Sequence, residues 1–459
     1  MDDETGTPAG ENVTPAGEGV PPTDEAGTPQ DAIDTPQDAG DDASGPPWTE
    51  HRGLWVLAWA LSLGLCLRTV ADKVVGLLAR DPQDRFRASE DLSVYQDAAI
   101  ALTHHLPLYE VGDHWRMGGE LILTYPPFAA LLFLPMAYTS TSAVVVLWHL
   151  TCLAALFTAL WTVARHEGFR RPAWLAAALT GPATLLYPVA STLHYGQINL
   201  VLLALVVADL LGVIPARFRG VGIGVAASLK LTPIGYCLVL LVRRDCASIA
   251  RALGTVAGIA AACWLLMPDA SRRYWTDFAW DTGHSGARWY TQNQSLTGPL
   301  LRAGVGEDSV TVPYVLLALV VIAAVAFCTW TLHRRGMETA AVAVTGLGVV
   351  LAAPMSFQHH WVVVVLLPVM ALVPAYRSWL PWIGGLVALF VADPAEWFMQ
   401  RDWSIRLGQP WYLQLLGSLV FVVAVATLVA VTVWCVRAAR GAPVTVGSRS
   451  ARPDDASTH

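Results

Sequence analysis

Four ionisable side chains stand out because each lies within or at the end of an apolar or helical segment. Asp91 begins a segment with helical periodicity, and Lys230 lies between two leucines. His359 and His360 are adjacent and precede a run of valines. A carboxylate can act as a general base, and an ammonium or imidazole group shielded from water can bind a phosphate. Ionisable residues inside a membrane are costly, and they mark functional sites by default.

Each of these residues also has a structural interpretation. Asp91 could simply cap the free amides at the start of a helix. Lys230 could reach the membrane surface or pair with a carboxylate. Neighbouring residues on a helix point about a quarter-turn apart, so His359 and His360 do not form a metal pair as HxxxH would. One of them could donate to a phosphate or sugar while the other packs.

Further polar residues lie at the ends of apolar segments. Gln197 and Asn199 precede a membrane helix, where they could bind neighbouring helices or a sugar hydroxyl. Tyr125 directly precedes Pro126 and Pro127, which hold the backbone in an extended conformation. The loop 268–311 carries Asn293 and Gln294 together with tyrosines and tryptophans, which suit either a membrane interface or a sugar ring.

The composition predicts an integral membrane protein. Of its 459 residues, 54% are hydrophobic and 14% charged, and the mean hydropathy is +0.46. Continuous apolar runs such as 142–164, 312–332 and 411–436 approach the length that crosses a bilayer as a helix. We therefore expect an all-α, polytopic bundle of about 11 to 13 helical segments.

The two ends of the chain differ from this bundle. Residues 1–50 contain thirteen acidic residues and no lysine or arginine. Removing these acids from the formal charge of −7 leaves +6 for the remainder. The sequence predicts a disordered, acidic cytoplasmic tail over 1–52, a transmembrane domain over 53–436 and a cytoplasmic tail over 437–459.

Arginine-rich loops predict the orientation, because such loops stay in the cytoplasm. They fall at 165–171, 217–219, 243–251, 333–335 and 437–440. Loops 71–125 and 268–311 are then outside, together with the turn 194–197 and residues 356–360. Two apolar stretches do not fit simple spans: 127–138 is short, and 220–242 must break near Lys230 and Pro233. Residues from Glu90 onward predict an amphipathic helix at the outer interface.

Six motifs in this order resemble the GT-C membrane glycosyltransferases and, more narrowly, the actinobacterial polyprenol-phosphate-mannose-dependent mannosyltransferases of glycosyltransferase family 87. The likeness covers most of residues 54–436. The motifs are Asp91-Leu92-Ser93-Val94-Tyr95, Tyr125-Pro126-Pro127-Phe128, Gly196-Gln197-Ile198-Asn199, Lys230-Leu231-Thr232-Pro233, Asn293-Gln294-Ser295 and His359-His360-Trp361.

This resemblance implies inverting transfer of mannose from polyprenyl phosphate to a glycolipid or lipoglycan, at the outer face of a bacterial cytoplasmic membrane. It implies that Asp91 is the catalytic base, and we expect Lys230 and the two histidines to bind the donor phosphate. Neither a cofactor nor a metal is expected, because the first loop has no DxD pair, and no nucleic-acid partner is expected. The expected substrate contacts are Tyr95, Tyr125, Gln197, Asn199, Asn293 and Gln294.

One departure concerns the sequence before the histidine pair. Family members commonly carry proline, serine and tryptophan there, whereas this chain has Ser356-Phe357-Gln358. The sugar and the acceptor therefore stay open, and arabinose is an alternative to mannose. Two other classes of function are a transporter or flippase of a lipid-linked sugar and a structural scaffold. The absence of a second long loop matching 71–125 favours an enzyme over a transporter.

Overall fold

The computed structural model describes residues 52–77, 89–110, 121–280, 287–393 and 410–440, all within one unit of the chain. The predicted acidic tail up to residue 51 and the predicted C-terminal tail from residue 441 lie outside the described residues. So do parts of the two predicted outer loops. The described residues form helices and no strand, with one isolated bridge between Asn293 and Phe357.

Six helices are long and apolar enough to cross a membrane, and a bent pair of helices adds a seventh candidate. This agrees with the predicted all-α, polytopic fold. α1 and α11 leave most of their apolar side chains exposed, as helices facing lipid do. The six are α1 (Arg52–Leu77), α5 (Thr141–His166), α11 (Cys246–Leu266), α14 (Thr311–Arg334), α17 (Leu380–Ala392) with its preceding turn from Pro374, and α20 (Leu419–Arg440); the bent pair is α6 (Pro172–Ala183) and α7 (Tyr187–Tyr195), at 76°.

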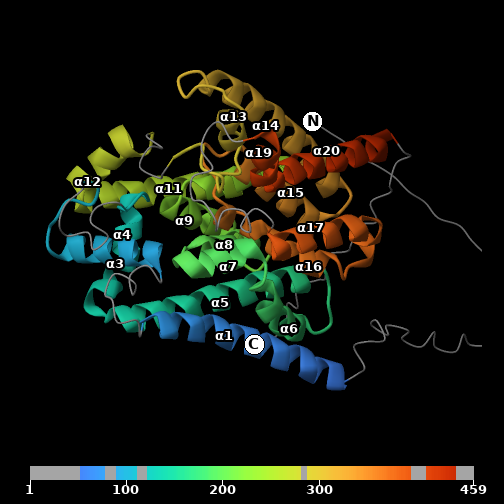
Figure 1. Cartoon of the computed structure of the whole chain (residues 1–459), viewed down its shortest axis with the longest axis horizontal. Helices are drawn as coiled ribbons and strands as arrows, with labels where there is room; N and C mark the ends of the chain where they lie inside the picture. Colours follow the sequence, from blue (N-terminus) through green and yellow to red (C-terminus); the bar gives the residue numbers. More distant parts are fainter. Residues whose placement is uncertain (1–51, 78–88, 111–120, 281–286, 394–409, 441–459) are drawn as a thin grey trace, which may run out of the picture. The chain divides into compact units, whose positions relative to one another are not determined.

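Shorter helices and turns fill the space between these spans. In Figure 1, α5 lies between α1 and α8, and it contacts both. The short helices are α3 (Glu90–Thr103), α4 (Pro127–Phe133), α8 (Asn199–Leu210), α9 (Val221–Leu229), α10 (Cys237–Val242), α12 (Pro268–Arg273), α13 (Thr297–Arg302), α15 (Glu338–Ala352), α16 (Leu366–Met370) and α19 (Trp411–Gly417), and the 3-10 turns are η2 (Leu134–Tyr138), η3 (Ala216–Phe218), η4 (Thr232–Tyr236), η7 (Gln358–His360), η8 (Val362–Val365) and η9 (Pro374–Trp379), with one π-helical turn, η5 (Tyr274–Phe278).

α8 and α9 form the hairpin that carries several site residues. The carboxylate of Asp209, near the end of α8, accepts from the backbone amides of Gly220 (2.7 Å) and Ile223 (2.9 Å) at the start of α9. A carboxylate at a helix N-terminus satisfies free amides and suits the helix dipole. α9 then ends at Leu229, and Lys230 is extended, with φ −152° and ψ 124°. The predicted break in 220–242 is confirmed.

The helix predicted after Glu90 forms as α3, but it is not amphipathic. Residues 92–99 are all buried, including the polar Gln96 and Asp97. The Gln96 amide donates to the carbonyls of Met136 and Thr139 and accepts from Thr141. The Gln96 side chain of α3 therefore packs on the turn between η2 and α5. The stretch 127–138 is short, as predicted, and ends where this contact is made.

Candidate active site

Asp91 is the first group of a hydrogen-bonded chain of buried side chains. It lies in the first turn of α3, whose N-cap is Ser89, so Asp91 is not the N-cap residue. Its Oδ2 instead accepts from Nε2 of Gln197, at 2.7 Å. Oε1 of the same amide accepts from the hydroxyls of Tyr125 (2.7 Å) and Tyr95 (3.3 Å). The tyrosine donors fix the orientation of the amide, which fixes the Asp91 carboxylate in turn.

A glycine allows this approach between α3 and the α7–α8 turn. Gly196 ends α7 in the left-handed region, with φ +74°. A Cβ at this position would lie 2.6 Å from Cβ of Leu92. Nε1 of Trp148 on α5 donates to the Gly196 carbonyl, at 2.7 Å, and holds the turn in place. Gln197, the next residue, is thereby brought to Asp91.

Lys230 is at the other end of the chain of hydrogen bonds. Its Nζ lies 3.4 Å from the Tyr125 hydroxyl, 3.2 Å from Oδ1 of Asn199 and 2.9 Å from Nε2 of His360. When Lys230 is protonated, its ammonium group can only donate, so this His360 nitrogen then accepts and the ring proton is on Nδ1. Among the described residues no carboxylate forms an ion pair with Lys230, which leaves its charge for an anionic ligand.

The two histidines have different surroundings. His360 faces Lys230, whereas the His359 ring makes edge-to-face contacts with Tyr195 (5.7 Å) and His360 (4.5 Å). The His359 carbonyl accepts from Thr192 Oγ1 (3.0 Å) and Asn199 Nδ2 (2.9 Å). Asn199 thus links the histidine segment to Lys230. His360 lines a small cavity together with Lys230, whereas His359 does not line it and packs against aromatic rings.

Asn293 and Gln294 are not in this cluster. Oδ1 of Asn293 accepts from the backbone amides of Ser295 and Ser356. The Gln294 amide donates to the Thr291 and Gly417 carbonyls and accepts from the Phe421 amide. Both side chains hold loop 288–297 against other backbone segments. Their predicted role in substrate binding stays a prediction.

Sequence reasoning did not select Ser356 as a site residue. It is fully buried, and its Oγ has no hydrogen-bond partner among the described residues. It lines a cavity of about 60 Å³ together with Asn199, Lys230 and His360. Its backbone is fixed by two hydrogen bonds. The Ser356 backbone amide donates to Asn293 Oδ1, and the Ser356 carbonyl accepts from the backbone amide of Gln294. The only feature of the sequence that could have indicated Ser356 as a site residue is its hydroxyl, three residues before His359.

Comparison with known proteins identifies the family. The model of glycosyltransferase family 87 matches residues 123–355. The chain is 34% identical over 333 residues to a polyprenol-phosphate-mannose-dependent alpha-(1-2)-phosphatidylinositol mannoside mannosyltransferase of Mycolicibacterium smegmatis, over 66% of this chain and 74% of that relative. The chain belongs to glycosyltransferase family 87.

A second relative gives the same result. The chain is 31% identical over 348 residues to a polyprenol-phosphate-mannose-dependent alpha-(1-2)-phosphatidylinositol pentamannoside mannosyltransferase of Mycobacterium tuberculosis, over 74% of this chain and 80% of the relative. No solved structure matches. The chain is therefore a membrane glycosyltransferase, and the predicted resemblance is confirmed. The segment matched by the family model includes Tyr125, Gln197, Asn199 and Lys230, whereas Asp91 and the histidine pair lie outside it.

The environment of Asp91 predicts a pH dependence for this family 87 enzyme. Asp91 belongs to α3, which is not a candidate span. Burial raises the pKa of its carboxyl to about 6, against the lowering effects of the Gln197 hydrogen bond and the Lys230 charge, and Glu90 adds to the rise. A general base at Asp91 would have to be unprotonated, so in that role kcat/KM should rise with pH through about 6 and then level off. A pH–rate profile whose acid limb lies near 4, the ordinary carboxyl value, would contradict this.

Proposed function

We propose that this family 87 glycosyltransferase transfers mannose from polyprenyl-phosphate mannose to a phosphatidylinositol mannoside, with Asp91 as the general base. The names of its relatives support the donor and the class of acceptor. The observation that carries the proposed mechanism is the hydrogen-bonded chain from Lys230 through Tyr125 and Gln197 to Asp91. It connects a group suited to bind phosphate with a group suited to accept a proton.

The reaction proposed is a single displacement. The acceptor hydroxyl gives its proton to Asp91, and its oxygen bonds to C1 of mannose as the bond from C1 to the phosphate oxygen breaks. Polyprenyl phosphate leaves with an additional negative charge, which faces Lys230 and His360 away from bulk water. The configuration at C1 is inverted. The mechanism requires neither a cofactor nor a metal.

We also propose that the site is reached from the outer face of the cytoplasmic membrane. Four of the five arginine loops contact one another or an adjoining residue: Arg251 donates to the Arg219 carbonyl, Arg243 pairs with Glu338 just after loop 333–335, and Arg335 donates to the Ala438 carbonyl. Their gathering supports a common cytoplasmic side. The nine residues of α9 separate Lys230 from that side by about 13 Å, roughly half of a 30 Å hydrocarbon core.

An assay with purified components tests this function. The full chain is reconstituted in lipid vesicles with polyprenyl-phosphate mannose and a phosphatidylinositol mannoside, and the product is analysed by mass and by anomeric configuration. We expect an acceptor carrying one additional mannose with the anomeric configuration inverted relative to the donor. The same incubation with polyprenyl-phosphate arabinose should give no product. Transfer of arabinose instead of mannose would overturn the donor assignment, and movement of donor across the bilayer without transfer would favour a flippase.

A further inference from the structure

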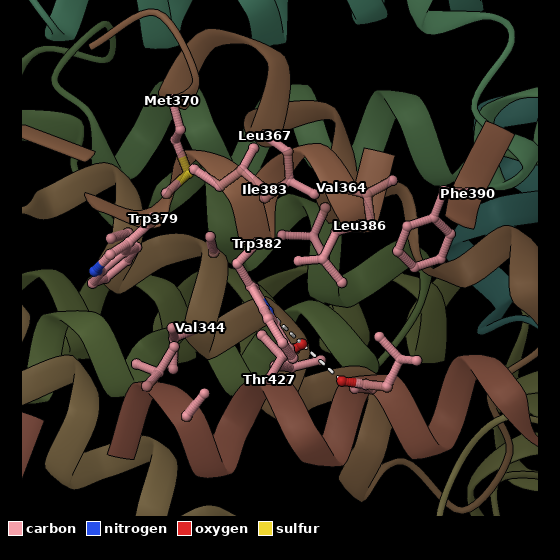
Figure 2. A pocket seen from close by; sticks show the side chains of 18 of the residues that line it. Val344, Val364, Leu367, Met370, Trp379, Trp382, Ile383, Leu386, Phe390 and Thr427 are labelled. Carbon is pink, nitrogen blue, oxygen red and sulfur yellow. Dashed lines mark hydrogen bonds between the residues drawn. The ribbon is translucent and has the colours of Figure 1, made fainter. Parts of the chain in front are cut away.

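A second cavity, away from the cluster at Asp91, is almost entirely apolar. It has a volume of about 270 Å³ and lies between α15, η8, α16, α17 and α20. Figure 2 shows side chains of these elements around it, with Trp379 and Phe390 at opposite ends of the view. Trp382 satisfies its indole N–H by donating to Thr427 Oγ1, at 3.1 Å (Figure 2). An apolar cavity of about 150 Å³ already binds small hydrocarbons, so this larger cavity, called the groove below, can hold a longer hydrocarbon chain.

The groove is elongated along the helices. Its lining on α20 extends from Val420 to Trp434, which corresponds to about 21 Å of helix. Arg335, in an arginine loop, lies over the Trp434 ring at 5.5 Å from its centroid. The groove therefore runs from the arginine-loop end of the bundle to the level of Trp361, over roughly two thirds of a hydrocarbon core of about 30 Å.

The other end of the groove adjoins the cavity of about 60 Å³ that Asn199, Lys230, Ser356 and His360 line, called the Lys230 cavity below. Trp361 lines the groove and directly follows His360, which lines the Lys230 cavity. Val363 lines both cavities, as part of the single turn η8. It lies close against α15, where a Cβ on Gly346 would be 2.6 Å from Val363 Cγ2. One valine side chain is thus a shared wall between the groove and the cavity.

The chemistry of the two substrates decides which chain the groove suits. In a polyprenyl-phosphate donor the hydrocarbon chain begins at the phosphate, which is bonded to the reacting carbon. In a mannosylated phosphatidylinositol the acyl chains are separated from the reacting hydroxyl by the inositol and its sugars. Only the donor chain must leave a phosphate bound at Lys230 directly into an apolar path. We propose that the groove binds the polyprenyl chain of the donor, an inference that rests on the proposed function.

Binding of a chain taken from the bilayer depends on shape. Lipid tails are as apolar as the groove, so no hydrophobic driving force favours the transfer, and close packing supplies the energy. A bulky side chain in the groove should therefore compete directly with the isoprenoid chain. Overpacking of this kind changes an equilibrium by roughly tenfold or more. A donor whose chain is too short to reach the groove should escape this effect.

Cavity-filling substitutions test the proposal. Ala424→Phe on α20 and Ala343→Phe on α15 place a ring in the groove, and Ala426→Phe is the matched control, on the exposed side of α20 outside the lining. The reconstituted full chain is assayed with mannose on full-length polyprenyl phosphate and on a single short isoprenyl phosphate. We expect the KM for the full-length donor to rise roughly tenfold in both groove variants, with little change for the short donor or for Ala426→Phe.

The remaining outcomes would each overturn the proposal. An unchanged KM for the full-length donor in both groove variants excludes the groove as its site. An equal loss with both donors shows a defect unrelated to chain length, and a loss that follows the acyl chains of the acceptor assigns the groove to the acceptor. Activity of the unsubstituted chain with the short donor keeps this test separate from the proposed function: if the unsubstituted chain transfers mannose from neither donor, it is the proposed function that fails.

Discussion

Asp91→Asn should lower kcat by about 10³-fold, near the middle of the range that a positioned general base contributes. Asparagine keeps the size of the side chain and can still bond to Gln197, but it cannot accept a proton from the acceptor hydroxyl at neutral pH. The KM values for both substrates should change little, because the substitution removes an interaction needed mainly in the transition state. Initial rates of mannose transfer in reconstituted vesicles measure the effect.

A matched substitution separates loss of the base from loss of a carboxylate in general. Asp277, in the π-helical turn η5, is exposed and pairs with Arg273, at 2.7 Å. Asp277→Asn should therefore retain the activity of the unsubstituted chain, since an exposed pair contributes little to stability. Turnover by Asp91→Asn within tenfold of the unsubstituted enzyme, at equal amounts of folded protein, would show that another group accepts the proton.

The long membrane helices could be predicted because apolar length alone defines them. The runs 142–164 and 312–332 became α5 and α14, each of which begins one residue earlier and ends two residues later than its run. The run 411–436 instead divides at Ser418 into α19 and α20, and α20 continues to Arg440, past the predicted end of the membrane domain. Hydropathy does not detect that division, because the side chain bound at the break comes from outside the run. The side-chain amide of Gln294 accepts from the backbone amide of Phe421 and donates to the Gly417 carbonyl.

Packing between distant segments could not be read from local periodicity. The pattern of α3 predicts an amphipathic helix, yet Gln96 is covered by residues 136–141 and Asp91 by Gln197. The same limit applies to Asn293 and Gln294, whose amides satisfy backbone groups of other segments. Asp91, Gln197 and Lys230 could be selected because each is a costly polar group at the end of an apolar helix. Such groups converge where the helices end together.

Lys230→Met should lower kcat/KM for the donor by about 10²- to 10³-fold, the effect of removing one preorganised group that stabilises developing charge. Methionine has nearly the length of lysine and fills the same space without its ammonium group. The phosphate of the donor is already anionic and gains charge as it leaves. Most of the loss should therefore be in kcat, with a smaller increase in the KM of the donor. The KM of the acceptor should not change.

Lys73→Met is the matched control, because it makes the same substitution at another lysine, which is buried. Its Nζ donates to the His194 carbonyl, at 2.6 Å, and so joins α1 to the end of α7 without contacting the Lys230 cavity. Lys73→Met should cost less than roughly tenfold in kcat/KM, because it removes the hydrogen bond to the His194 carbonyl but no group that lines the Lys230 cavity. A Lys230→Met enzyme as active as Lys73→Met would exclude an interaction of Lys230 with the leaving phosphate. The larger loss is expected at Lys230 because no carboxylate among the described residues pairs with its charge, which the departing phosphate then faces directly.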